Sequence, residues 1–331
     1  MGRIPSESEK SMDYSVLILS YNSEYKKTLR TIDSVLRQKN VSYEIIICDD
    51  GSKKNYFPEL EEYLSDKQIP YKLTGGDENV GTVRNILRGL QQASGIYIKL
   101  IGSGDLLYNE LTLYDVAEFM KNENVPCCFG AMRGFREKEG CYYAAQQYSP
   151  RDILAYREQN TKKICRNLML CEDWVSGAAI FATTEYFKKY LSIIEGTVIY
   201  CEDWASAIAA VDQVFLKYLD QYVVWYELGD GISTSANEEF KKKLLQDNVN
   251  FWKLFDEYCE KHNASELKKY INKRKRKKRL DYIKNEKIKT IYKSLVNPDM
   301  VLYEFYVRRQ ERAGLHVPQT EATEGFLALS D

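Results

Sequence analysis

Short apolar runs alternate with helix-length segments through the first 122 residues, and this alternation constrains the fold more than any other feature of the sequence. Apolar, β-branched runs of this length predict buried strands. They cover residues 14–20, 43–48, 71–74 and 96–101. The helix-length segments cover residues 25–38, 56–67, 81–93 and 110–122. Strands that alternate with helices pair in parallel, so we expect an α/β fold with a Rossmann-like, mostly parallel twisted sheet flanked by helices.

A polar or glycine-containing group follows each predicted strand. Right-handed crossovers bring the carboxyl ends of parallel strands to one edge, where such sheets bind ligands. The groups are Ser20-Tyr21-Asn22, Asp49-Asp50-Gly51-Ser52, Asn79-Val80-Gly81 with Arg84 one turn later, and Gly102-Ser103-Gly104-Asp105. The sequence therefore predicts a ligand site at this edge of the sheet.

Histidine content and glycine spacing exclude several classes of enzyme. The two histidines, His262 and His316, lie late in the chain, which argues against a Ser-His-Asp triad or a His-rich zinc site. No glycine occurs in residues 20–25, where a dinucleotide-binding turn would place one, and no P-loop pattern is present. The chemistry then has to rest on carboxylates, hydroxyls and a hard metal ion.

The expected environment is reducing. The eight cysteines form no CxxC pair, no apolar run approaches the ~18 residues of a membrane span, and residues 1–12 have no hydrophobic signal core. We therefore expect a cytoplasmic protein with reduced thiols.

Asp49, Asp50 and Asp105 make the predicted edge acidic. Carboxylates repel a bare phosphate, whereas a divalent cation between the two reverses the sign, so the pattern favours a metal-bridged diphosphate. The alternative is that Asp49-Asp50-Gly51-Ser52 caps the turn that follows its strand, because Asp and Ser are good capping residues. The spacing alone leaves both interpretations open.

The pattern changes after about residue 127. We expect strands at 127–135, 175–182 and 222–226, a helical, loop-rich stretch at 143–166, and helices at 205–219 and 238–262. Residues 241–312 contain 21 Lys and Arg against 10 Asp and Glu. We divide the chain into a domain at 13–235, a basic helical extension at 236–312, and a tail at 313–331 that we expect to be disordered.

Five segments together resemble the family 2 glycosyltransferases, which have the GT-A fold. They are SVLILSYNSEYKKTLRTIDSVLRQ, YEIIICDDGS, ENVGTVRN, ASGIYIKLIGSGD and YCEDW, and the resemblance covers residues 13–235. It implies that Tyr21 lies against the nucleotide base, that Asp50 accepts a hydrogen bond from the base, usually uracil, and that Asp49 supports it. It also implies that Arg84 contacts the base or a phosphate. We add Ser103 to this donor-binding set.

In the same way, the resemblance implies that Asp105 coordinates manganese or magnesium at the diphosphate. Here the sequence departs from the family pattern. Gly102 and Gly104 stand where the family often has acids, so Asp105 is the one acid left in this loop.

The pair Glu202-Asp203 resembles the family's ED motif, which precedes a helix. In inverting members a carboxylate there deprotonates the acceptor hydroxyl, and we expect Asp203 to do so, with Glu202 as the second candidate. The alternative is a charge pair that stabilises a helix N-terminus. Cys-Glu-Asp-Trp also occurs at 171–174, where the family does not place its base.

Four residues are candidates for the acceptor side. Indole rings stack on sugar faces, although packing in the core is the alternative for both tryptophans. The candidates are Trp174, Ser176, Gly177 and Trp204.

The function that we infer is inverting transfer of a sugar from a nucleotide-sugar, most often a UDP-sugar, to a hydroxyl of a glycan or lipid-linked oligosaccharide, assisted by metal. The alternatives are a non-catalytic partner subunit, for which the missing acids argue, and a sugar nucleotidyltransferase. The basic run 268–279 suggests peripheral binding to an anionic membrane surface at the inner face of the cell membrane, or else a solvated helix face. No recognised module indicates nucleic-acid binding.

Overall fold

The architecture follows from a computed structural model of the 331-residue chain. It describes residues 12–138, 141–147, 149–229, 238–262, 264, 267, 269–273, 291, 295, 297 and 298. The predicted tail at 313–331 and most of the basic run at 268–279 lie outside these residues.

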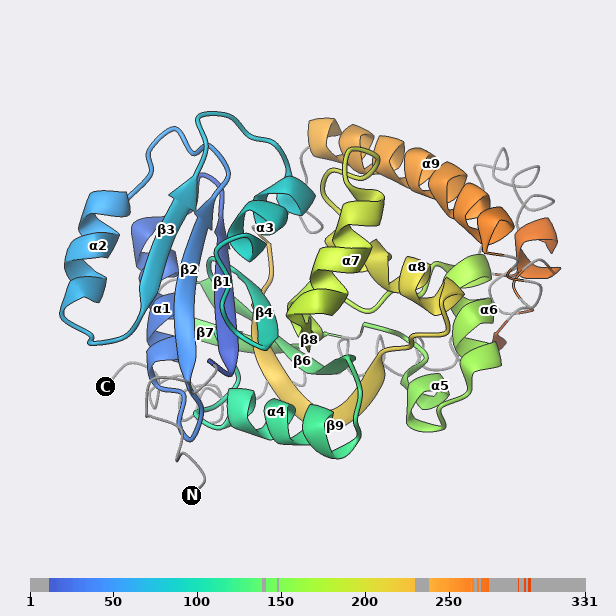
Figure 1. Ribbon diagram of the computed structural model, residues 1–331, viewed down its shortest axis with the longest axis horizontal. Helices are drawn as coiled ribbons and strands as arrows, with labels where there is room; N and C mark the ends of the chain where they lie inside the picture. The colour runs from blue at the N-terminus through green and yellow to red at the C-terminus, as the bar shows by residue number, and fades with distance from the viewer. Residues whose placement is uncertain are drawn as a thin grey trace, which may run out of the picture.

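Half of the sheet is the parallel unit that the sequence predicts (Figure 1). Its spatial order is β3-β2-β1-β4, and all three of its pairings are parallel. The central strand β1 is buried on both faces, which explains its unbroken apolar run. The bounds are β1 Tyr14–Ser20, β2 Tyr43–Asp49, β3 Tyr71–Gly75 and β4 Tyr97–Gly102.

The sheet continues beyond β4 as a mixed sheet, in the order β4-β8-β6-β9-β5, with β7 paired to β6. The β4–β8, β8–β6, β6–β7 and β9–β5 pairings are antiparallel, and β6–β9 is parallel. The bounds are β5 Leu106–Leu107, β6 Cys127–Lys138, β7 Cys141–Gln147, β8 Ile180–Thr183 and β9 Lys217–Glu227.

Helices cover the sheet, as expected for an α/β fold, and one buried core runs through the whole assembly (Figure 1). The first four are α1 Tyr25–Leu36, α2 Phe57–Ser65, α3 Thr82–Leu90 and α4 Thr112–Asn122. The later ones are α5 Ile153–Arg157, α6 Thr161–Cys171, α7 Thr184–Ile194, α8 Ala205–Val211 and α9 Glu238–Lys261, with 3-10 turns η2 Gly177–Ala179 and η3 Glu202–Trp204.

The second half of the chain differs from the sequence prediction in three places. Residues 143–147 are not helical but belong to β7, which forms by pairing with β6. The predicted helix at 205–219 ends at Val211, because Gln213 adopts a left-handed φ of 62° and β9 begins four residues later. The predicted strand at 175–182 is divided into η2 and β8.

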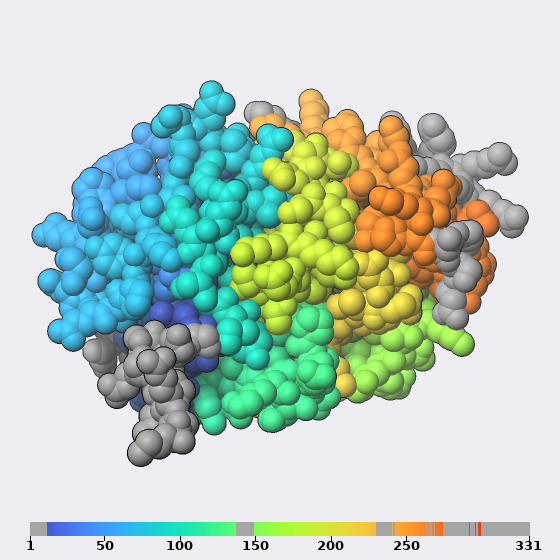
Figure 2. Space-filling model, in the orientation of Figure 1, coloured from blue at the N-terminus to red at the C-terminus, as the bar shows by residue number. Residues whose placement is uncertain are grey.

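Helix α9 confirms the predicted amphipathic helix and packs into the body of the protein. Phe251 and Phe255 are fully buried and belong to the core. In Figures 1 and 2 the orange α9 segment lies directly against the α7 and α8 segments. The division of the chain at residue 235 stays a prediction.

Two further observations concern the environment of the chain. The cysteines that the structure describes are free thiols, and of these Cys201 alone is partly exposed. Within the described residues, no helix combines the length and the apolar content that a membrane crossing requires.

Candidate active site

The loops that follow β2 and β4, the two strands beside β1, are hydrogen-bonded to the last residues of β1. The backbone N–H of Asp50, after β2, donates to the carbonyl of Ser20 at 2.9 Å. The N–H of Ser103, after β4, donates to the carbonyl of Leu19 at 2.9 Å. The residues that follow β1, β2 and β4 therefore meet at one edge, as the parallel topology predicts.

Asp49 stabilises its own turn. One carboxylate oxygen accepts the N–H of Ser52 at 2.8 Å and the other accepts the Ser52 hydroxyl at 2.6 Å. The Ser52 hydroxyl oxygen in turn accepts the N–H of Asn22 at 2.7 Å, which ties the segment after β1 to this turn. Asp49 therefore caps its own turn, which is the alternative interpretation given in the sequence analysis. Its role in the site is then to support this turn.

Asp50 holds the loop that precedes α3. Its two carboxylate oxygens accept the N–H groups of Val80 and Gly81, each at 2.9 Å. The side chain is buried, and burial raises the pKa of Asp50 in spite of these two hydrogen bonds. Asp50 therefore fixes the loop at Val80 and Gly81 against the end of β2.

Two candidate donor-binding residues are open to solvent at this edge. Tyr21 is 40% exposed, so its ring is accessible to a ligand at this edge. The side chain of Arg84 is 56% exposed, and its Nε lies 3.7 Å from a carboxylate oxygen of Glu195. Such an exposed pair is weak, so Arg84 is available to an anionic ligand at little cost. The hydroxyl of Ser103 instead pairs with that of Thr28 at 2.7 Å.

Asp105 lies deeper than a metal ligand at an open cleft would. The residue is 8% exposed, and one of its carboxylate oxygens accepts the N–H of Glu227 at 2.8 Å. Burial raises the pKa of Asp105 to about 7. Among the described residues, no group of three or more His, Cys, Asp and Glu side chains is arranged to hold a metal ion. These surroundings do not fit a divalent cation held by protein carboxylates, and the predicted metal stays a prediction.

The carboxylate of Glu227 fills the space beside Gly104. A β-carbon at residue 104, where φ is +110°, would collide with a carboxylate oxygen of Glu227. Glu227 itself pairs with Lys27 at 3.0 Å and lies 3.5 Å from Arg30. The sequence has a glycine at position 104, where the family often has an acid. The carboxylate of Glu227, from β9, therefore occupies the space where that acid would lie, and it pairs with Lys27 and Arg30.

Lys99 of β4 is fully buried in the middle of the sheet. Its ammonium donates to the carbonyl of Ala178 in η2 and lies 4.2 Å from the ring centre of Phe181. Burial lowers the pKa of Lys99 to about 7, and the negative charge of Asp105 opposes this shift. Lys99 thus links the donor-side loop to the turn on the acceptor side.

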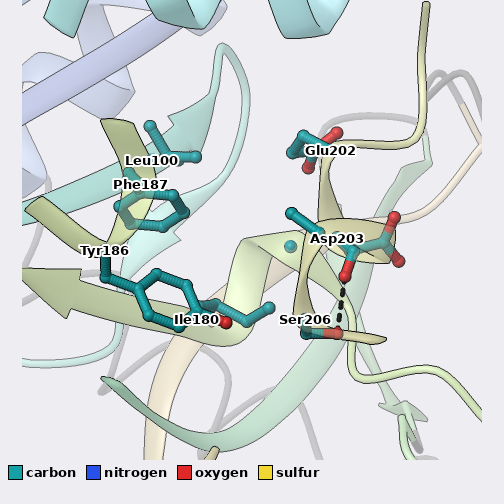
Figure 3. Close-up of a pocket in the computed structure, with 9 residues that line it drawn as sticks. Leu100, Ile180, Tyr186, Phe187, Glu202, Asp203 and Ser206 are labelled. Atoms are coloured by element: carbon teal, nitrogen blue, oxygen red, sulfur yellow. Dashed lines mark hydrogen bonds between the residues drawn. The ribbon is translucent and has the colours of Figure 1, made fainter. Parts of the chain in front are cut away.

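Glu202 and Asp203 form the first part of η3 and line a small pocket. Figure 3 shows the two acids opposite the apolar side chains of Leu100, Ile180 and Phe187. Burial raises the pKa of Glu202 to about 7. Burial and the neighbouring charge of Glu202 raise the pKa of Asp203. A carboxylate with a raised pKa is suited to take a proton near neutral pH.

The acceptor-side turn lies against this acidic pair. A β-carbon at Gly177 would collide with a carboxylate oxygen of Glu202, so η2 lies directly against the side chain of Glu202. Ser176 is partly exposed and immediately precedes Gly177. The predicted acceptor residues 176 and 177 therefore lie beside the candidate base.

The two tryptophans pack together behind the acidic pair. Their ring centres are 5.5 Å apart, and Trp204 is buried. Phe251 of α9 lies 5.8 Å from Trp174 and 5.2 Å from Trp204. For Trp204 the structure supports core packing, the alternative to sugar stacking, because aromatic neighbours cover the ring. Trp174 keeps part of its surface exposed.

Gly81 and Ile199 connect the donor-side loop with the catalytic turn. A β-carbon at Gly81, where φ is +88°, would collide with the side chain of Ile199 and lie 2.7 Å from its carbonyl oxygen. That carbonyl accepts the N–H of Val83 at 3.1 Å. Since Asp50 holds Gly81 and Ile199 lies three residues before Glu202, the two halves of the site form one unit.

Three charged residues of this site were not predicted from the sequence: Lys99 and Asp247, which are buried, and Glu227, which is partly buried. Lys99 carried a local signal, because it interrupts an apolar strand. Asp247 carried one as well, because it lies four residues before Phe251 on the apolar face of α9. No local pattern in the sequence indicates Glu227, because its position depends on the pairing of β9 with β5 and β6.

Comparison with known proteins adds independent findings. Residues 15–191 match the sequence model of the family described as Glycosyl transferase family 2. An uncharacterized glycosyltransferase of Haemophilus influenzae is 24% identical over 243 residues, which are 72% of this chain and 73% of that protein. An uncharacterized glycosyltransferase of Rickettsia bellii is 33% identical over 111 residues, 33% of this chain but 15% of that protein.

This chain is also similar to part of a synthase and to a solved structure. The poly-beta-1,6-N-acetyl-D-glucosamine synthase of Staphylococcus epidermidis is 27% identical over 130 residues, 39% of this chain and 31% of that protein. This chain thus corresponds to a minor part of both the Rickettsia and the Staphylococcus relatives. The crystal structure of S. aureus TarS 1-349 in complex with UDP-GlcNAc covers 92% of each chain, with a TM-score of 0.52 and 17% identity, and shares the fold.

Proposed function

This chain belongs to glycosyl transferase family 2 and is a glycosyltransferase, and from that premise we propose that it transfers a sugar from a UDP-sugar to a hydroxyl of a glycan or lipid-linked oligosaccharide, with inversion. UDP-GlcNAc is the first donor to test, because TarS binds it and a relative synthesises a poly-N-acetylglucosamine.

The observation that carries the proposal is the position of Glu202-Asp203. The pair borders a pocket, has a raised pKa, and is fixed to the donor-side edge through the contact between Ile199 and Gly81. A general base fixed close to the donor-side edge suits a single displacement, because both reactants then meet in a defined geometry.

The proposed step moves one proton and one sugar. The Asp203 carboxylate accepts the proton of the acceptor hydroxyl while that oxygen forms a bond to the anomeric carbon. The bond from the anomeric carbon to the diphosphate oxygen breaks, its electron pair stays on the diphosphate, and UDP leaves. Because attack and departure occur on opposite faces of the carbon, the configuration inverts.

Residues at the sheet edge assist this step. Tyr21 lies against the base, the loop held by Asp50 lines its edge, and Arg84 approaches the diphosphate, where an exposed cation stabilises the leaving charge. The steps rest on the groups of this chain, because the surroundings of Asp105 do not fit a metal held by carboxylates.

Asp203→Asn tests the proposal. The amide cannot accept the proton, so kcat for transfer and for UDP-sugar hydrolysis should fall about 100-fold or more. The matched control is Glu172→Gln, in the first copy of Cys-Glu-Asp-Trp, where the side chain is exposed and the activity should stay within about twofold of wild type. Equal turnover by Asp203→Asn and wild type would refute the assignment of the base.

We also propose that residues 268–279 bring the enzyme to an anionic membrane that carries the acceptor. The support is the basic sequence itself, since each Lys or Arg near such a surface contributes about 1 kcal/mol. Co-sedimentation with vesicles of anionic lipid, lost at high salt and absent with neutral vesicles, is the expected result. Equal sedimentation with both kinds of vesicle would contradict it.

A further inference from the structure

A carboxylate from α9 holds the segment that leads into the catalytic turn. Asp247 is 1% exposed, and one of its oxygens accepts the backbone N–H of Ile199 at 2.9 Å and of Tyr200 at 2.7 Å. Tyr200 is followed by one residue, Cys201, before η3 begins at Glu202. The contact spans 47 residues of sequence and joins a helix to a stretch without regular structure.

The two hydrogen bonds to Asp247 are stronger than hydrogen bonds between neutral groups. Hydrogen bonds from backbone N–H groups to a carboxylate are shorter and about twice as strong as those between neutral groups. Burial raises the pKa of Asp247, and the two N–H groups oppose that shift, so they stabilise the charged form. Removal of the carboxylate would leave the N–H groups of Ile199 and Tyr200 without this acceptor.

Helix α9 is itself fixed in relation to the turn. Phe251, one helical turn after Asp247, packs on Trp204 of η3. At its beginning, Phe240 contacts the ring of Tyr200, with ring centres 5.7 Å apart. Figure 1 shows α9 extending from the region of α3 across α7 and α8. The helix therefore contacts both ends of the segment from Tyr200 to Trp204.

The same segment reaches the donor side. Ile199 contacts Gly81 and accepts the N–H of Val83, and Gly81 is held by Asp50. A continuous series of contacts thus runs from Asp247 through Ile199 to the donor-side loop.

We propose that Asp247 is a positioning residue of the transferase: it fixes the Ile199–Tyr200 segment, and through it the Glu202-Asp203 turn. This inference rests on the proposed function, since it concerns the geometry of that site. It also assigns α9, which lies beyond the matched residues 15–191, to the active site.

The experiment compares Asp247→Ala and Asp247→Asn with Tyr258→Phe. Tyr258 lies on the same helix and donates to Asp212 at 3.1 Å, away from the catalytic turn, so it controls for a general loosening of α9. We expect kcat for transfer to fall about 10- to 100-fold in Asp247→Ala, because small displacements of reacting groups have effects of this size. The asparagine variant keeps an acceptor oxygen and should retain most of kcat.

Two binding and exchange measurements separate positioning from general damage. The affinity for UDP should change by less than about threefold in Asp247→Ala, or ~0.7 kcal/mol, because Asp50 still holds Val80 and Gly81. Hydrogen–deuterium exchange should increase at residues 199–204 in Asp247→Ala and stay unchanged there in Tyr258→Phe. If the alanine variant does not fold, Asp247→Glu, which displaces the acceptor oxygen by one methylene, is expected to give the same direction of change.

Exchange at 199–204 that is equal in wild type and Asp247→Ala would overturn the inference, as would an equal loss of kcat in Tyr258→Phe. A wild type that turns over no UDP-sugar would instead contradict the proposed function. In that case the exchange measurement still decides whether Asp247 holds the segment.

Discussion

The side chain of Ile199 lies directly against the α-carbon of Gly81, so that no β-carbon fits between the catalytic segment and the donor-side loop. The two residues are 118 positions apart in sequence, and neither lies in a helix or strand. The donor and catalytic halves of the site therefore depend on one close contact between two loops.

Gly81→Ala should disturb both the donor-side loop and the segment that leads into Glu202-Asp203. The substitution adds a colliding β-carbon at a left-handed φ of +88°, and backbone strain of this kind costs about 1–3 kcal/mol. We expect the free energy of unfolding in urea to fall by that amount and the affinity for UDP to fall with it. Gly76→Ala is the control, because its β-carbon would meet the flexible end of Arg88. Equal effects of the two substitutions would contradict the role of this contact.

The activity should depend on pH through the acidic pair. The base has to be deprotonated, and burial raises the pKa of Glu202 to about 7 and that of Asp203 above its usual value. We therefore expect kcat/KM to rise with pH, with a midpoint above the usual pKa of an aspartic acid. In Glu202→Gln the midpoint of this rise should move to lower pH, because the charge that raises the pKa of Asp203 is gone. A midpoint that does not move between pH 5 and 9 would argue against the assignment.

The same pair should make the folded state less stable as pH rises. A carboxyl group whose pKa is higher in the folded state stabilises that state below its unfolded pKa, and this contribution is lost as pH rises through the folded pKa near 7. The slope of unfolding free energy against pH between 5 and 7 should therefore be less negative in a Glu202→Gln variant. Urea titrations at each pH provide the measurement.

Lys99 should have the opposite effect on stability. Burial lowers its pKa to about 7, so the unfolded chain binds more protons between pH 7 and 10 and stability rises with pH there. In Lys99→Met, which keeps an apolar side chain of similar length, this rise should be smaller by up to ~1.4 kcal/mol per pH unit. Unfolding curves from pH 7 to 9 test this, and parallel curves for the two proteins would contradict the burial of a titrating lysine.

Removal of divalent metal should weaken UDP binding little. Asp105 is buried and accepts the N–H of Glu227, and Lys27 and Arg30 pair with Glu227 beside Gly104. We expect the dissociation constant for UDP to change by less than about threefold, or ~0.7 kcal/mol, when EDTA replaces manganese. Isothermal titration calorimetry provides the measurement. A change of more than about tenfold would show that a cation site forms when the nucleotide binds.

The sequence determined the parallel half of the fold and the edge at which the site lies. The apolar runs around Leu17, Ile46 and Leu100 and the helices between them are local patterns, and the rule for right-handed crossovers then brings Tyr21, Asp50 and Ser103 to one edge. The later elements were less predictable, because β7 and β9 exist through pairing with β6 rather than through their own periodicity.

The tertiary structure alone decided what the individual acids do. Asp49 and Asp50 are neighbours in sequence, yet one caps its own turn and the other holds a loop 30 residues away. Asp247 and Glu227 belong to the site because helix α9 and strand β9 return to it from distant parts of the chain. Spacing in a sequence reports local geometry, whereas the burial and partners of a carboxylate depend on which distant backbone groups the fold brings to it.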